Sequence, residues 1–205
     1  MKRTITARRS GAVLAALALS MSLAACGGGN DDTTAKEAAP EETMATASGP
    51  AAQTFGEACS AVPKSGAGSF DGMATAPVAS AASANPLLKT LVAAVTQADL
   101  VDTLNTAEGL TVFAPTDEAF AKIPKADLDA VLADKAKLTQ ILTHHVVEGQ
   151  LDPSEVVGEH DTLNKDTVEV EGDEAGMTVD GANVLCGNIP TDNATVYVID
   201  TVLMP

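Results

Sequence analysis

The middle of the chain carries apolar residues at helical spacing. Leu and Val residues between positions 87 and 95 fall on one side of a helix, and they follow Asn85-Pro86, a favoured way to begin a first turn. This pattern predicts a helix that buries one face. Shorter patterns of the same kind predict helices over residues 100–104, 125–132 and 135–142.

The remaining apolar segments have the character of strands. A largely apolar run over residues 110–114 predicts a buried strand that Pro115-Thr116 ends. Beyond residue 156 apolar and polar positions alternate, and glycines separate the segments at turns. The expected strands are 146–147, 167–171, 177–179, 182–185, 196–199 and 202–203. Most helices precede most strands, so the predicted class is α+β with a single folded domain.

The extreme N-terminus has the pattern of an export signal. Four basic residues lie before residue 10, and a short apolar stretch over residues 12–23 follows them. The stretch ends in Leu23-Ala24-Ala25-Cys26, which resembles the bacterial lipobox. This resemblance implies a lipoprotein signal peptide over residues 1–25, with Cys26 receiving the lipid after cleavage. The alternative is an ordinary signal peptide with an incidental cysteine.

The segment after Cys26 lacks the residues needed for a core. Residues 26–53 are rich in Gly, Ala, Thr, Glu and Asp, a composition that favours a disordered linker. Residues 54–71 contain Gly, Pro and Ser punctuation and are expected to form a loop-rich lead-in. The predicted location is therefore the outer face of a cell membrane, held by a lipid anchor, with a released extracellular form as an alternative.

Charge restricts the possible partners. The chain has 205 residues, a formal net charge of −16 and no Trp. All arginines precede residue 10, and the 8 lysines after that point face 28 Asp and Glu residues. Nucleic acid is therefore disfavoured, because phosphate binding needs clustered Lys and Arg. Basic or neutral partners fit this balance better.

Three cysteines occur in the chain. With Cys26 assigned to the lipid, Cys59 and Cys186 remain in a protein predicted to be exported, where disulfides persist. A Cys59–Cys186 disulfide is therefore expected, which would pin the lead-in to the strands near the C-terminus. The alternative is a pair of free reactive thiols. No Cys and His spacing typical of a zinc site is present.

Three segments together resemble the fasciclin (FAS1) domain. They are Leu110-Thr-Val-Phe-Ala-Pro-Thr-Asp-Glu-Ala-Phe120, Leu142-Thr-His-His-Val-Val-Glu-Gly149 and Asn193-Ala-Thr-Val-Tyr-Val-Ile-Asp-Thr-Val-Leu-Met-Pro205. The resemblance covers residues 72–205, and within the family it points to mycobacterial secreted and lipid-anchored antigens. It implies a β-wedge or small sandwich flanked by helices. It also implies an extracellular role in adhesion, with matrix proteins, other proteins or envelope glycans as partners.

The same motifs contain the candidate binding residues, which are Thr116, Asp117, His144 and His145. Thr116 and Asp117 suit helix caps and turns, and we expect their turn to approach solvent. His145 matches the family histidine, whereas His144 stands where the family usually has Tyr. Since neighbouring residues of a strand point to opposite faces, we expect at most one of the two histidines to face the core.

No catalytic signature accompanies these motifs. The chain lacks GxSxG, HExxH, P-loop and GxGxxG patterns, so we expect no enzyme, no cofactor and no metal. The acidic stretch 169–174 lacks the spacing of a calcium-binding EF-hand. Two alternatives to a binding role are a small-ligand carrier or enzyme that uses a cleft, and a purely structural envelope protein.

The lipobox provides the first test. Replacing Cys26 by Ala removes the sulfur that would carry the lipid, so the protein should leave the membrane or remain unprocessed. Partitioning into a detergent phase measures the change. If the Cys26→Ala protein partitions into detergent as the unmodified protein does, lipid anchoring at Cys26 is wrong.

Overall fold

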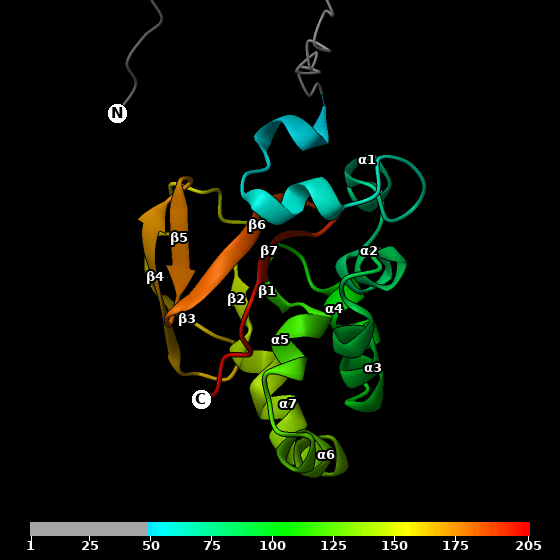
Figure 1. Cartoon of the computed structure of the whole chain (residues 1–205), viewed down its shortest axis with the longest axis vertical. Helices are drawn as coiled ribbons and strands as arrows, with labels where there is room; N and C mark the ends of the chain where they lie inside the picture. Colours follow the sequence, from blue (N-terminus) through cyan, green and yellow to red (C-terminus); the bar gives the residue numbers. More distant parts are fainter. Residues whose placement is uncertain (1–48) are drawn as a thin grey trace, which may run out of the picture. The chain divides into compact units, whose positions relative to one another are not determined.

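The computed structural model describes residues 49–205 (Figure 1). The predicted signal peptide, Cys26 with its predicted lipid, and the predicted linker up to residue 48 lie outside the described residues. The end of the predicted linker forms a short 3-10 helix, η1, at Pro50–Gln53.

Most helices precede most strands along the chain, although one strand lies between the fourth and fifth α-helices. After η1 and η2 (Glu57–Ala61), the helices are α1 (Phe70–Met73), α2 (Val78–Ala84), α3 (Lys89–Gln97), α4 (Val101–Thr106), α5 (Asp117–Ala121), α6 (Lys125–Ala133) and α7 (Lys135–His144). The strands are β1 (Leu110–Pro115), β2 (Val146–Glu148), β3 (Gly158–Asp161), β4 (Thr167–Asp173), β5 (Gly176–Val179), β6 (Ala182–Pro190) and β7 (Ala194–Ile199). The predicted α+β class is confirmed.

The strands form one sheet in the order β2-β1-β7-β6-β5-β4-β3. Only the β1–β7 pair is parallel among these neighbours, and the others are antiparallel. An isolated bridge between Val147 and Thr162 brings the β2 end of the sheet to the β3 end. The sheet therefore nearly closes on itself, and the helices lie on one side of it (Figure 1).

The central strands β1 and β7 separate two apolar cores. Val112 and Val196 are paired in register and pack with the helices, whereas Phe113 and Tyr197 are paired one residue further on and pack inside the curved sheet. Alternate side chains of a strand point to opposite faces, so one pair of strands serves both cores. This explains why every residue of β1 and β7 is buried.

Several helix and strand predictions need correction. The helix predicted from Asn85-Pro86 begins only at Lys89, because the Asn85 side chain accepts a hydrogen bond from the Leu87 amide and forms a turn. The predicted strand at 202–203 is not a strand, although both residues are buried. The lead-in over 54–71 is more regular than expected, because it contains η2 and the start of α1.

Helix α2 was not predicted at all. Its first two amides are capped by distant side chains, since Asn193 accepts from the Val78 amide at 2.9 Å and Asn105 accepts from the Ala79 amide at 3.1 Å. No local residue caps this helix. In the part of the chain that the structure describes, no helix is long and apolar enough to cross a membrane.

Asn193 connects the β6–β7 turn with two helices, and its loss should be costly. Its amide also donates to the carbonyls of Leu104 and Ala107, at 2.8 and 2.7 Å. We expect Asn193→Ala to lower the free energy of unfolding by about 2–4 kcal/mol in urea titrations, because several partly buried groups lose their partner. The exposed neighbour Asp192→Ala should change it by no more than about 0.5 kcal/mol. Equal effects of the two substitutions would contradict this role of Asn193.

Candidate functional site

Thr116 and Asp117 act as helix caps. The Thr116 hydroxyl accepts a hydrogen bond from the Ala119 amide at 3.1 Å and begins α5. Asp117 accepts from the Thr90 amide at 2.7 Å and so caps α3 from another element. The predicted capping is confirmed. The expected approach of both residues to solvent is only partly right, because Thr116 is 6% exposed while Asp117 is half-buried.

The two adjacent histidines do not lie on a strand, so that prediction is wrong. Helix α7 continues through His144, and His145 is its C-cap. Both side chains are buried, with exposed fractions of 3% and 2%. Neither ring reaches solvent, whereas a strand would have turned one of the two rings away from the core. His144 therefore cannot form part of an exposed binding surface.

His145 is a neutral structural residue. The Leu203 amide donates to Nε2 at 3.0 Å, so Nε2 is an acceptor and the ring proton sits on Nδ1. Nδ1 in turn donates to the Ile141 carbonyl at 2.7 Å. Burial, and to a smaller extent the neighbouring His144, lower the pKa of His145 to about 4, although the Ile141 carbonyl favours the protonated ring. His145 thereby holds the C-terminal segment against α7.

His144 lies between two carboxylates from the sheet. Its Nδ1 is 2.8 Å from Oδ1 of Asp166, in the turn between β3 and β4, and its Nε2 is 3.8 Å from Oδ2 of Asp180, in the turn between β5 and β6. The Asp166 contact is short but poorly directed, so Nδ1 has a nearby charge without a good hydrogen bond. This arrangement connects the end of α7 to two turns of the sheet.

Asp166 is held in its ionised form. Partial burial alone would raise the pKa of Asp166, but hydrogen bonds from Thr162 and Asn164 and the approach of His144 outweigh it and lower the pKa to about 2. The Asn164 amide donates to Oδ2 at 2.7 Å, and the Thr162 hydroxyl donates to Oδ1. The sequence analysis missed Asp166 and Asp180, because their role depends on contacts with a helix far away in the chain.

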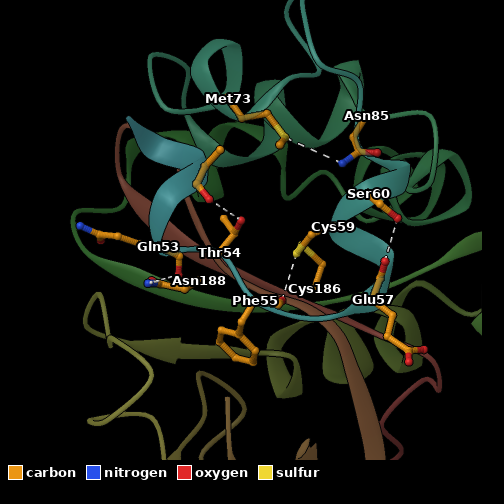
Figure 2. Close-up of a disulfide and its surroundings, with 11 residues drawn as sticks. Gln53, Thr54, Phe55, Glu57, Cys59, Ser60, Met73, Asn85, Cys186 and Asn188 are labelled. Carbon is orange, nitrogen blue, oxygen red and sulfur yellow. Dashed lines mark hydrogen bonds between the residues drawn. A yellow bond between two sulfur atoms is a disulfide. The ribbon is translucent and has the colours of Figure 1, made fainter. Parts of the chain in front are cut away.

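The lead-in is fastened to β6 by a disulfide between Cys59 and Cys186 (Figure 2). This is the pairing that the sequence predicted. Beside it, the Phe55 amide donates to the Gly187 carbonyl at 3.3 Å and the Gly187 amide donates back at 2.8 Å. The Asn188 side chain donates to the Gln53 carbonyl at 3.1 Å. We call residues 53–62 the strap.

The described residues enclose three small apolar cavities, the largest of them next to β1, and they also form two open grooves. The largest cavity has a volume of about 60 Å³ and lies among α2, α3, α4 and β1. Its polar lining residues are Thr103, Thr143 and His145. Pockets for drug-sized ligands measure roughly 300–1,000 Å³. The cavity therefore lacks both the size and the convergent polar groups that a small-ligand carrier would need.

The two open grooves are large enough for a bound segment. One, of about 520 Å³, lies beside α5 and includes Asp117, Phe120 and Lys122. The other, of about 490 Å³, lies between the loop 153–157 and the β4–β5 hairpin, and includes Val157 and Glu174. Within residues 49–205, no three acidic, His or Cys side chains come together in a way that could hold a metal ion.

Comparison with known proteins identifies the family. The fasciclin domain family matches residues 86–205. Cell surface glycolipoprotein MPT83 of Mycobacterium tuberculosis is 45% identical over 209 residues, which cover 95% of this chain and 94% of that protein. Immunogenic protein MPB70 of Mycobacterium bovis is 49% identical over 145 residues, which cover 68% of this chain and 75% of that protein. This chain therefore belongs to the fasciclin-domain family.

A solved structure is also similar. A FAS1 domain pair from the insect cell adhesion molecule fasciclin I aligns with a TM-score of 0.49 and 24% identity, and the match covers 57% of this chain and 45% of that one.

The neutral state of His145 predicts acid sensitivity. Below its ordinary pKa of 6.5 the unfolded chain binds a proton at this residue, whereas the folded protein resists protonation until the pH nears 4. Stability present at pH 7 should therefore fall by about 1 kcal/mol at pH 5.5 and by about 2 kcal/mol at pH 4.5 from this group. Asp166 and Asp200, whose pKa values are lowered to about 2, remove further stability as the pH falls below 3.8.

The measurement is urea unfolding of the unmodified protein and of His145→Gln across pH 4.5–7. Gln can accept from Leu203 and donate to Ile141 but does not titrate, so the stability gap between the two proteins should narrow as the pH falls. His160→Gln, at a half-buried histidine elsewhere, is the control. Parallel pH profiles for the unmodified protein and His145→Gln would show that His145 is not the acid-sensitive group.

Proposed function

We propose that this chain is a lipid-anchored, cell-surface fasciclin protein that acts by binding other macromolecules in adhesion. The lipobox ending at Cys26 supports the anchor. The alignment with MPT83, whose name describes a cell surface glycolipoprotein, spans 95% of this chain and supports a surface or secreted location. Extracellular or matrix proteins and envelope glycans are the proposed partners.

The observation that carries the proposal is an acidic outer face on the sheet. Glu159 of β3 lies directly opposite Glu169 of β4, and both side chains are exposed. Lys165 is the only Lys or Arg between residues 146 and 205, which contain 13 Asp and Glu. Like charges placed opposite each other destabilise a sheet. A surface of one sign therefore suits a cationic partner, whose charge would relieve this repulsion.

An apolar feature adjoins this acidic face. Val157 is 41% exposed and lies in the groove of about 490 Å³ beside Asp173 and Glu174. Burial raises the pKa of the Tyr197 hydroxyl, and the negative charges of Asp152, Glu174 and Glu155 raise it further. An exposed apolar residue rimmed by carboxylates fits a basic protein segment that also carries apolar side chains.

The other candidate functions receive less support. The cavity of about 60 Å³ is too small for a carrier of ordinary ligands. The family and the relatives' names favour a non-enzymatic protein. A purely structural envelope protein would not need a face of one charge sign, and binding measurements separate that alternative from ours.

Charge neutralisation tests the acidic face. We expect Glu171→Gln, Asp173→Asn and Glu174→Gln together to weaken binding of an immobilised Lys- and Val-rich peptide by at least about tenfold, since several ion pairs are lost. Asp173→Asn keeps the oxygen that accepts from the Ala175 amide, so the hairpin should stay folded. Binding by the unmodified protein should also weaken between 0.1 M and 1 M salt, as the screening length falls from about 10 Å to about 3 Å.

The control carries the same change in net charge on the helical side. Glu118→Gln, Asp127→Asn and Asp129→Asn alter exposed residues of α5 and α6 and should change affinity less than about twofold. If both triple variants lose binding equally, the acidic face has no special role. Binding that persists at 1 M salt would instead indicate apolar docking.

A further inference from the structure

One edge of β6 lacks a full strand partner. Strand β5 pairs with β6 only at Asn183 and Ala182, whereas β7 pairs with β6 as far as Pro190. Beyond residue 183, the edge of β6 on the β5 side is met by the strap instead, through the antiparallel bridge between Phe55 and Gly187. An uncovered strand edge is a template for pairing with another chain, and proteins commonly cover such edges. The strap is this cover.

The strap fits its position closely. A side chain at Gly187 would place its Cβ 2.3 Å from the Phe55 ring, so only glycine lets that ring lie on the strand. A Cβ at Gly56 would come 2.3 Å from the Leu185 carbonyl. The Phe55 ring also packs edge-on against Tyr197, with centroids 6.3 Å apart. Figure 2 shows Phe55 and the disulfide side by side on the strand.

The noncovalent contacts that hold the strap are few. The helices η1 and η2 contain no buried residue, and Val62 is the only fully buried residue of the strap, while Phe55 and Cys59 are partly buried against the cores. The segment after it is exposed from Lys64 to Ala67, and a Cβ at Gly66 would meet no atom within 4 Å. This segment can therefore act as a hinge. The Cys59–Cys186 disulfide is the strongest connection between the strap and β6.

We infer that the strap is an exchangeable edge cover, and that without the disulfide the β6 edge is a docking site for the strap of a second copy of this chain. The second copy can reproduce every contact of the closed form, because the exchanged segment is identical. The strap's own chain competes at an effective concentration on the order of mM, so exchange should become appreciable at similar protein concentrations. The disulfide keeps each molecule closed.

Two complementary variants test this exchange. In the full chain carrying Cys26→Ala, Cys59→Ser retains Cys186 alone, and Cys186→Ser retains Cys59 alone. We mix them near 1 mM with oxidised glutathione, which takes two electrons and two protons from a thiol pair and becomes two glutathione molecules as the protein disulfide forms. The expected product is a mixed dimer joined by Cys59 of one copy and Cys186 of the other, formed at least about tenfold faster than either homodimer.

Matched glycine variants distinguish docking from random collision. Gly187→Ala in the copy that carries Cys186 should slow mixed-dimer formation to the homodimer rate, because its Cβ would clash with the incoming Phe55 ring. Gly176→Ala in β5, whose Cβ would meet no atom within 4 Å, should leave the rate unchanged. Phe55→Ala in the copy that carries Cys59 removes the same contact from the other side and should also slow the reaction.

Mass spectrometry of non-reduced peptides identifies the joined cysteines, and circular dichroism checks that each variant is folded. Mixed dimers that form no faster than homodimers would overturn the inference. The inference would also be overturned if Gly187→Ala and Gly176→Ala gave equal rates of mixed-dimer formation and Phe55→Ala had no effect on that rate.

Discussion

The parallel pairing of β1 with β7 is the constraint on which the rest of the structure depends. Two parallel neighbours cannot be joined by a tight turn, so the whole segment between Pro115 and Ala194 has to leave one end of β1 and return to the start of β7. That segment contains three helices and five strands. Both strands are buried on both faces, one against helices from before and after β1 and the other inside the curved sheet.

Polar residues join the two layers where the apolar cores end. Asn193 connects the β6–β7 turn with α2 and α4, and His145 connects α7 with the C-terminal segment. His144, beside it, faces Asp166 and Asp180 from two turns of the sheet. These residues have defined structural tasks in places where a binding role was also conceivable. Their burial directs attention to the outer face of β3, β4 and β5 as the surface available to partners.

The distribution of charge also favours the outer face of β3, β4 and β5 as the binding surface. Lysines are concentrated in the first part of the described domain, whereas the charged residues after residue 146 are all acidic except Lys165. A folded domain gains nothing from Glu159 opposite Glu169, because the repulsion opposes strand pairing. The strap, which pairs with β6, lies where the chain enters the sheet. The proposed binding surface and the proposed attachment are thus carried by different strands.

The sequence by itself determined the elements that depend on local pattern and on composition. The apolar run of β1, the alternation in β4 and β5 and the pairing of Cys59 with Cys186 could all be predicted, because periodicity and the number of cysteines are local or countable properties. The tertiary structure alone decided features whose partners are distant. Helix α2 is capped by Asn193 and Asn105, and α7 extends to His144, whose ring is buried beside two turns of the sheet. The burial of His144 beside Asp166 likewise arises only when the sheet closes against the helix, since no spacing along the chain brings these residues together.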